Sequence, residues 1–155
     1  MKTCGIITEY NPFHQGHIYH IKKTKELTQC DCLIAIVSNH FTQRGLFSLL
    51  TMEDKTKLAL EAGCNLVMEL PPCYAAQSAD YFAKYAVESL SQLHIDQICF
   101  GSETNNISTL KEYSKQMEST QVVPSLSMNQ NLYTKNIRPN DILGIQYIKQ
   151  CEKYG

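Results

Sequence analysis

The fold class of this chain is decided by the segment Gly5-Ile6-Ile7-Thr8-Glu9-Tyr10-Asn11-Pro12-Phe13-His14-Gln15-Gly16-His17-Ile18. Its apolar, β-branched beginning predicts a buried strand, and Pro12 stops that strand because proline has no N–H for the ladder. A helix is expected to begin near Gly16. Parallel sheets bind ligands beyond the carboxyl end of a strand, where free N–H groups at a helix N-terminus favour an anion. The segment therefore predicts a phosphate site at a strand-to-helix turn.

Two histidines flank the glycine of this segment. We expect His14 in the loop before the helix and His17 in its first turn, so that both imidazoles converge on one phosphoryl group. Gly16 has no Cβ, which lets a phosphate approach the backbone closely. We predict that His14 and His17 are catalytic; the alternative is that they only cap a surface helix. His20 lies one turn beyond His17 and fits a partly buried helix residue.

The composition is that of one folded domain without strong charge. The chain has 155 residues, of which 43% are hydrophobic, and a formal net charge of −1. No overall field attracts nucleic acid, and no apolar run is long enough to span a membrane. Met1-Lys2-Thr3 leads into a strand rather than a signal peptide. The seven cysteines have no zinc-like spacing and suggest reduced thiols and a cytoplasmic location, with Cys32 and Cys99 as small buried strand residues.

The rest of the sequence alternates between strand-like and helix-like segments. Strands are predicted at Cys4–Glu9, Cys32–Val37, Leu66–Leu70 and Gln97–Phe100. Helices are predicted at Gly16–Leu27, Met52–Glu61, Ala79–Leu93, Ile107–Met117 and, with Asn140 as N-cap, through Lys153. The alternation predicts a Rossmann-like α/β fold, a doubly wound parallel sheet with helices on both faces. We expect an α/β domain over 1–118, an irregular connection over 119–138 and, over 139–155, the start of a helix that continues the catalytic region.

Longer blocks of this sequence carry a resemblance to a known family. His14-Gln15-Gly16-His17 resembles the His-x-Gly-His signature of a nucleotidyltransferase superfamily. Six blocks of this sequence resemble the bacterial tRNA(Met) cytidine acetate ligases and occur in the same order as in that family. They are Ile7–His20, Phe41–Gly45, Asn65–Pro71, Gln77–Asp80, Cys99–Glu103 and Pro139–Gly144. The chain departs from the family at Val37-Ser38-Asn39-His40, where the family has Met-Ser-Gly-Asn, and at Leu46-Phe47-Ser48, where it has Glu-Pro-Ala. Members are longer, so the resemblance implies their N-terminal catalytic part.

The resemblance implies an ATP-dependent ligase that activates acetate as acetyl-adenylate and acetylates the wobble cytidine of elongator tRNA(Met). The resemblance then implies ATP as the nucleotide, with Mg²⁺ as a possible companion. Acetate and elongator tRNA(Met) are the expected partners, and no membrane is expected to be involved. The oligomeric state stays open. By the same similarity, the residues that bind ATP are Ile7, Thr8, Glu9, Tyr10, Asn11, Pro12, Phe13, His14, Gln15, Gly16, His17, Ile18, Tyr19, His20, Gly101 and Asn140.

Four residues outside the motif have two interpretations each. Gly101 follows a strand at the same sheet edge, and we favour a nucleotide contact over an ordinary turn. Asn140 is either a nucleotide ligand or a plain N-cap. Arg44 is a candidate for phosphate, acetate or RNA, or else a solvated loop arginine. Lys55 either extends a basic surface toward RNA or is simply solvated.

Three carboxylates, Glu9, Glu69 and Glu103, end predicted strands near the presumed cleft. Nothing in their spacing specifies a metal site, so we assign no metal ligand. Two other function classes stay open beside the ligase. A nucleotidylyltransferase acting on a small phosphorylated metabolite is permitted by the His-x-Gly-His motif, and a non-catalytic nucleotide-binding protein by the substituted loop.

Overall fold

The computed structural model describes residues 1–119 and 137–154. These residues belong to two compact units, Met1–Phe100 and Gly101–Gly155, which we describe separately. The expected connection over 119–138 lies almost entirely outside the described residues, and the three-part division of the chain stays a prediction. No helix among the described residues is long and apolar enough to cross a membrane.

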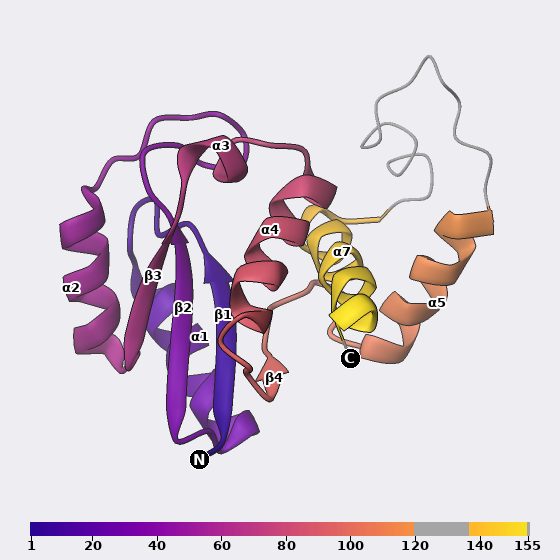
Figure 1. Ribbon diagram of the computed structural model, residues 1–155, viewed down its shortest axis with the longest axis horizontal. Coiled ribbons are helices and arrows are strands. Elements are labelled where there is room, and N and C mark those ends of the chain that lie inside the picture. The colour runs from indigo at the N-terminus through magenta and orange to yellow at the C-terminus, as the bar shows by residue number, and fades with distance from the viewer. Residues whose placement is uncertain (120–136, 155) are drawn as a thin grey trace. The chain divides into compact units, whose positions relative to one another are not determined.

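The first unit is built on a parallel sheet of four strands (Figure 1). The strands are β1 (Thr3–Thr8), β2 (Cys32–Ser38), β3 (Leu66–Leu70) and β4 (Gln97–Ile98), in the order β3-β2-β1-β4. β1 pairs with β2 from Thr3 opposite Cys32 to Thr8 opposite Val37. The Rossmann-like, doubly wound fold predicted from the sequence is confirmed.

Helices cover both faces of this sheet. α1 (Gln15–Thr28) and α2 (Met52–Ala62) place Ile21 and Ala59 in one core with Cys4 and Ile6 of β1. On the other face, α4 (Ala79–Ser91) lies so close that a Cβ on Gly5 would stand 2.7 Å from Leu90 Cδ1. Successive strand residues point to opposite faces, and both faces of β1 are therefore buried.

The element boundaries differ from the prediction in a few places. β1 ends at Thr8. Tyr10, two residues further on, has a left-handed backbone (φ 50°) that is not compatible with a strand. β4 has only two residues, and a short helix α3 (Pro72–Ala75) that we did not predict follows β3. Cys32 and Cys99 were expected to be buried, but both are only half-buried, because they lie at the start of β2 and beyond the end of β4.

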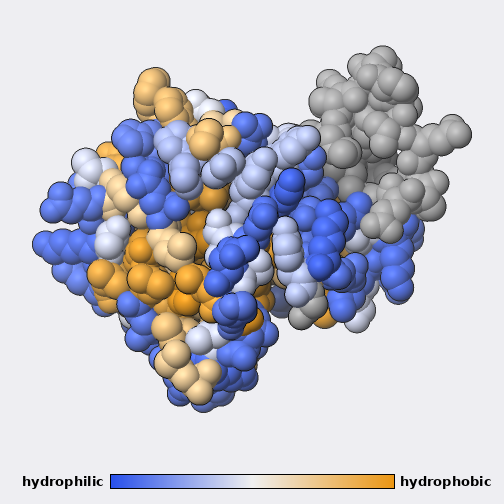
Figure 2. Space-filling view, in the orientation of Figure 1, coloured by the Kyte–Doolittle hydropathy of each residue, from blue (hydrophilic) through white to orange (hydrophobic). Residues whose placement is uncertain are grey.

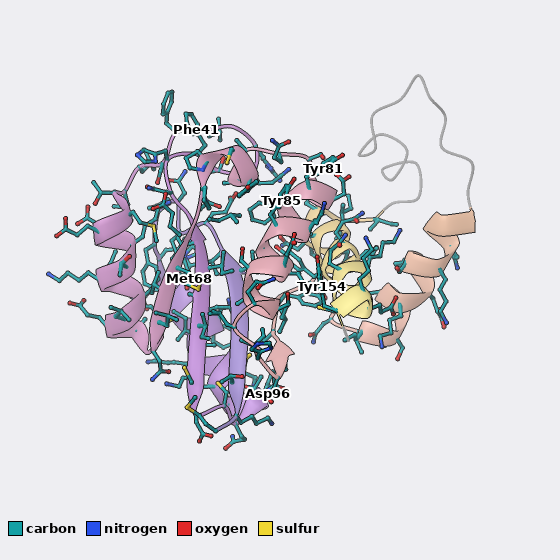
Figure 3. The ribbon with its side chains drawn as sticks, viewed as in Figure 1. Phe41, Met68, Tyr81, Tyr85, Asp96 and Tyr154 are labelled. Carbon is teal, nitrogen blue, oxygen red and sulfur yellow. The ribbon has the colours of Figure 1, made fainter. Side chains whose placement is uncertain are left out.

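The edge strand β3 is partly exposed, whereas the amino ends of β1 and β4 are held together by hydrogen bonds. Apolar surface gathers over the edge strand β3 in Figure 2, where Leu66 is 42% exposed and Leu60 of α2 is 43% exposed. At the amino ends of β1 and β4, the carboxylate of Asp96 (labelled in Figure 3) accepts hydrogen bonds from the N–H of Thr3 (2.6 Å) and from its hydroxyl (2.8 Å). These bonds lower the pKa of Asp96 and fix the start of β1.

The second unit contains α5 (Ile107–Ser119) and α7 (Pro139–Tyr154). α7 packs with α5 and buries Ile145 completely. α7 begins at Pro139, a position that favours proline because the first helical N–H needs no partner. Asn140 therefore lies inside the first turn, and its predicted role as N-cap is wrong.

Candidate functional site: the turn between β1 and α1

The carboxyl end of β1 lies at the place where this fold type binds ligands. β1 is flanked by β2 on one side and by β4 on the other. The strand order therefore reverses at β1: β2 and β3 extend the sheet to one side, and the later strand β4 is added on the opposite side. In open parallel sheets a crevice forms outside the carboxyl ends at such a reversal. The segment Glu9–His14 leads from this point into α1, and the topology thus puts the histidine motif at the sheet's binding edge.

His14 and His17 lie together as predicted, one before α1 and one in its first turn. His14 is the N-cap, and its Nδ1 accepts the N–H of Gly16 at 3.1 Å. The N–H of His14 donates to Nδ1 of His17 at 3.2 Å, which completes a capping box. The two rings are stacked, with centroids 3.9 Å apart and planes 25° from parallel.

This arrangement sets the chemistry of both imidazoles. Each Nδ1 accepts a backbone hydrogen bond, so the neutral ring of each histidine carries its proton on Nε2, an assignment that rests on the hydrogen-bond pattern. The hydrogen bonds of the capping box do not use Nε2 of either ring. His14 and His17 can therefore cap the helix and still present two adjacent N–H donors. The capping interpretation and the phosphate interpretation are compatible.

His17 is held neutral by its surroundings. Burial, together with the neighbouring His14 and His20, lowers its pKa from 6.5 to about 4. Tyr10 packs edge-on against the His17 ring at a centroid distance of 5.0 Å, and Phe13 lies 5.5 Å away. A phosphate approaching these rings would supply the negative charge that the protein withholds and would raise the pKa of His17.

The N-terminus of α1 is electrostatically open. No acidic side chain lies in its first turn, so the positive end of the helix dipole is not neutralised there. Gly16 is exposed, and a Cβ on it would stand 2.9 Å from Cε1 of His14. The structure thus gives Gly16 a role that the sequence did not suggest, because the bare backbone lets the His14 ring lie across the helix end.

The remaining motif residues surround this turn in different degrees of burial. Tyr10 is 1% exposed, whereas Tyr19 is 67% exposed on the outer side of α1. His20 is half-buried; burial lowers its pKa, and its Nε2 has no hydrogen-bond partner among the described residues. Ile7, Thr8, Pro12, Gln15 and Ile18 lie in β1, in the turn and in α1, so Ile7–His20 forms one continuous segment around the strand end.

A small hairpin over residues 41–48 packs against the motif. Asn11 joins the two, since its Oδ1 accepts the N–H of Leu49 at 2.6 Å and its Nδ2 donates to the carbonyl of Phe47 at 3.4 Å. The hairpin turns at Gly45, where φ is +76° and glycine is favoured. Arg44 is exposed on this turn. Its role with phosphate, acetate or RNA stays a prediction.

The prediction for Lys55 is wrong in both of its forms. This lysine neither extends a basic surface nor is solvated, because its side chain is 1% exposed. Its Nζ donates to the carbonyl of Ser38 at 2.7 Å and to that of Asn39 at 3.1 Å. Lys55 is thus a buried cation beneath the end of β2, which sequence reasoning missed because no local pattern marks it.

The three strand-end carboxylates each accept hydrogen bonds from the protein. Glu9 accepts the N–H of Gln43, and Glu69 accepts Nδ2 of Asn39 at 2.8 Å. In the second unit Glu103 accepts the N–H of Asp141 at 3.0 Å. Among the described residues, no group of three or more His, Cys, Asp and Glu is arranged to hold a metal ion. No residue is assigned as a magnesium ligand.

Gly101 and Asn140, the two predicted ATP ligands outside the motif, both lie in the second unit. Gly101 is exposed, and a Cβ there would meet no atom within 4 Å. Asn140 donates from Nδ2 to Glu103 at 3.0 Å, so the Glu103 carboxylate caps α7 in its place. Nucleotide binding by both residues stays a prediction.

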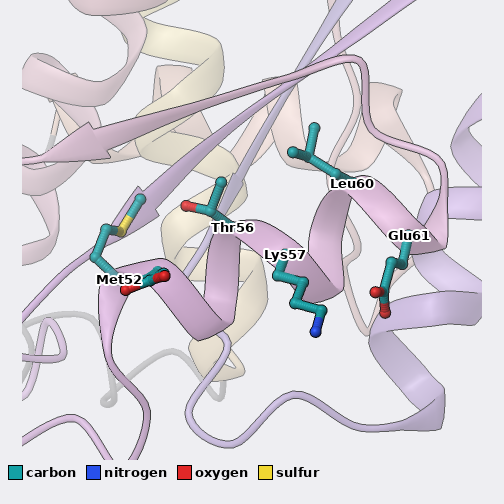
Figure 4. A pocket seen from close by; sticks show the side chains of 6 residues that line it. Met52, Thr56, Lys57, Leu60 and Glu61 are labelled. Atoms are coloured by element: carbon teal, nitrogen blue, oxygen red, sulfur yellow. The ribbon is translucent and has the colours of Figure 1, made fainter.

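Two pockets lie on the first unit near α2. One, of about 370 Å³, is bordered by His14 and Phe13 together with Ile18, Lys22 and Leu58. The other, of about 490 Å³, follows α2 from Met52 to Glu61 and contains none of the predicted site residues (Figure 4). The first pocket adjoins the histidine turn and extends it toward α2.

Comparison with known proteins places this geometry in context. The model of the HIGH Nucleotidyl Transferase family matches residues 1–155. The tRNA(Met) cytidine acetate ligase of Geobacillus sp. (strain WCH70) is 40% identical over 169 residues, 96% of this chain and 42% of the relative. That of Clostridium perfringens (strain SM101 / Type A) is 50% identical over 116 residues, 74% of this chain and 29% of the relative.

A solved structure is also similar to this chain. The crystal structure of Thermotoga maritima TmcAL bound with alpha-thio ATP has a TM-score of 0.86 and 30% sequence identity, over 99% of this chain and 44% of that chain. The resemblance inferred from the sequence is thereby confirmed. The chain spans less than half the length of the curated relatives it matches.

Proposed function

The chain belongs to the HIGH nucleotidyl transferase family, and from that premise we propose that it forms the ATP-binding catalytic part of a tRNA(Met) cytidine acetate ligase. The observation that carries the proposal is the stacked pair His14 and His17 at an uncompensated helix N-terminus. Two Nε2–H donors and the free N–H groups of the first turn suit a triphosphate. The likeness to relatives of that name, and to a TmcAL structure that holds alpha-thio ATP, supports ATP as the nucleotide.

The first proposed step is adenylation of acetate. A carboxylate oxygen of acetate attacks the α-phosphorus of ATP, the bond from that phosphorus to the bridging oxygen breaks, and pyrophosphate leaves. No proton has to move, so positioning and charge stabilisation supply the catalysis. Nε2–H of His14 and of His17 donates to phosphate oxygens that gain charge in the transition state. Mg²⁺ bound to the triphosphate would neutralise part of its charge, and no step is derived through it.

The second proposed step transfers the acetyl group to RNA. The exocyclic amine of the wobble cytidine in elongator tRNA(Met) attacks the acetyl carbonyl, AMP leaves, and the nitrogen loses a proton. We assign no residue of this chain to that step. Arg44, exposed on the hairpin next to the motif, is the candidate for a contact with phosphate, acetate or RNA. A cytoplasmic location follows from such a substrate.

The test is acetate-dependent exchange of labelled pyrophosphate into ATP. Exchange that requires acetate supports the ligase. Exchange only with a small phosphate ester would instead establish a metabolite nucleotidylyltransferase, and ATP binding without any exchange would establish a non-catalytic nucleotide-binding protein. Either of the last two results overturns the proposal.

His17→Ala tests the assigned residue within the same assay. One preorganised donor of this kind is worth about 3 kcal/mol of barrier, so adenylation should fall by roughly 10²-fold with a smaller change in ATP affinity. The exposed His94, changed to asparagine, is the matched control. An unchanged single-turnover rate in the His17 variant would refute the assignment.

A further inference from the structure

Lys55 is fully buried although it lies in a surface helix. It stands one turn into α2, and Nζ reaches the last residue of β2 and the one after it. The bonds to the carbonyls of Ser38 (2.7 Å) and Asn39 (3.1 Å) use two of its three donors. Lys57, two residues further along the same helix, is exposed. The burial is therefore particular to Lys55 and does not follow from the helix as a whole.

The burial of this ammonium is costly. Desolvation lowers its pKa, and the carboxylate of Glu9 opposes that shift from beyond ion-pair distance. The one ion pair recorded among the described residues joins Lys23 to Glu26 and does not involve Lys55. A buried charge without an adjacent counter-charge is usually less stable than an apolar side chain of similar volume. Packing alone thus gives no reason for a cation at this position.

Both bonds of Lys55 hold the end of β2, which lies between the ends of β1 and β3. Asn39, whose carbonyl it holds, donates from Nδ2 to Glu69 at the end of β3 (2.8 Å). Glu9, just beyond the end of β1, accepts the N–H of Gln43 in the hairpin. The cation therefore lies beneath the carboxyl edge of β1, β2 and β3. That edge is also where the histidine turn begins.

We propose that Lys55 is a positioning residue for adenylation: its ammonium fixes the turn after β2 at the edge that receives the triphosphate, and its charge favours the nucleotide there. This assignment rests on the proposed function. Lys55 acts without touching the nucleotide. A buried positive charge is screened much less than a surface one, so it attracts an anion through the protein.

Substitutions separate the effect of the Lys55 charge from the effect of its hydrogen bonds. They are made in the full-length protein. Lys55→Gln keeps an N–H donor without charge, Lys55→Met removes both, and Lys57→Met is the matched control on the same helix. In pyrophosphate exchange with acetate, Lys55→Met should lower kcat/KM more than tenfold and Lys55→Gln about tenfold, with Lys57→Met within twofold. Thermal unfolding confirms that each variant is folded. Where Lys55→Met fails to fold, Lys55→Gln decides the result.

The pH profile provides a readout that a purely structural role would not move. The carboxylate of Glu9, at the end of β1, acts on Lys55 electrostatically. Glu69, at the end of β3, is bonded to Asn39, whose carbonyl Lys55 holds. Glu53 and Asp54, on the same helix as Lys55, are exposed. As pH rises, deprotonation of Lys55 removes its charge, so wild-type exchange should fall at alkaline pH. Lys55→Gln should show a lower rate without that fall. Retention of the fall in Lys55→Gln, or rates within twofold of wild type in both folded variants, overturns the proposal.

A binding measurement keeps this inference separate from the proposed function. If the wild type shows no acetate-dependent exchange, the proposed function fails, and calorimetry with a non-hydrolysable ATP analogue still decides the role of Lys55. Lys55→Gln should then bind the analogue at least fivefold more weakly than Lys57→Met. Equal affinities of these two variants would overturn the proposal.

Discussion

The depressed pKa of His17 makes the stability of the protein depend on acid in a calculable way. The folded protein takes up a proton on His17 only near pH 4, whereas the unfolded chain does so near 6.5. Between these values the unfolded state binds more protons, so the free energy of unfolding falls as the pH is lowered from about 6.5 to about 4. The stabilisation that is present above pH 6.5 is lost in this window.

The magnitude follows from the two pKa values. Their difference corresponds to about 3 kcal/mol, and partial exposure of the His17 ring reduces the expectation to about 2 kcal/mol. His20, whose pKa is also lowered by burial, adds a loss of the same sign. Asp96, whose pKa is lowered from 3.8, loses its stabilising bonds only at a pH below this window.

Urea unfolding between pH 4 and pH 7 measures this loss. His17→Asn should remove about 2 kcal/mol of the difference between the two pH values, whereas the exposed His40→Asn should leave the wild-type slope in place. A His17 variant with the full wild-type pH dependence would refute the reasoning, because the acid sensitivity would then arise elsewhere.

Substitutions at three positions of the site and the core give further predictions. His14→Ala should cost about 1 kcal/mol of stability in urea unfolding, whereas His14→Asn should keep the cap and lose ATP affinity; equal stability losses would argue against the cap. Gly16→Ala should displace the His14 ring and weaken ATP binding about tenfold in calorimetry at little cost in melting temperature, because its Cβ would stand 2.9 Å from that ring in an exposed turn; unchanged affinity would contradict this. Gly5→Ala should lower the free energy of unfolding by about 1–3 kcal/mol, because its Cβ would overlap Leu90 and Ile95; a neutral result would show that α4 can move away.

The features that the sequence predicts well are those with a local signature. Parallel strands appear as short apolar runs, so β2 (Cys32–Ser38) and β3 (Leu66–Leu70) could be predicted to within one residue. The relation between His14 and His17 also follows from their spacing, because residues three apart meet at a helix start.

The features that the sequence did not predict depend on distant partners. Lys55 is buried where the carbonyls of Ser38 and Asn39, seventeen and sixteen residues away, accept hydrogen bonds from its ammonium group. Asn140 is not the N-cap because Glu103, 37 residues earlier, takes that role. Such pairings arise from the tertiary fold and leave no periodic or capping pattern near either residue.

Imidazole nitrogen NMR of His14 and His17 during an ATP titration tests the central claim most directly. The account predicts that ATP shifts the Nε2 signals of both rings and raises the pKa of His17 well above its value of about 4 in the free protein. Saturating ATP that leaves both rings and that pKa unchanged would contradict it, because the triphosphate would then bind somewhere other than the turn between β1 and α1.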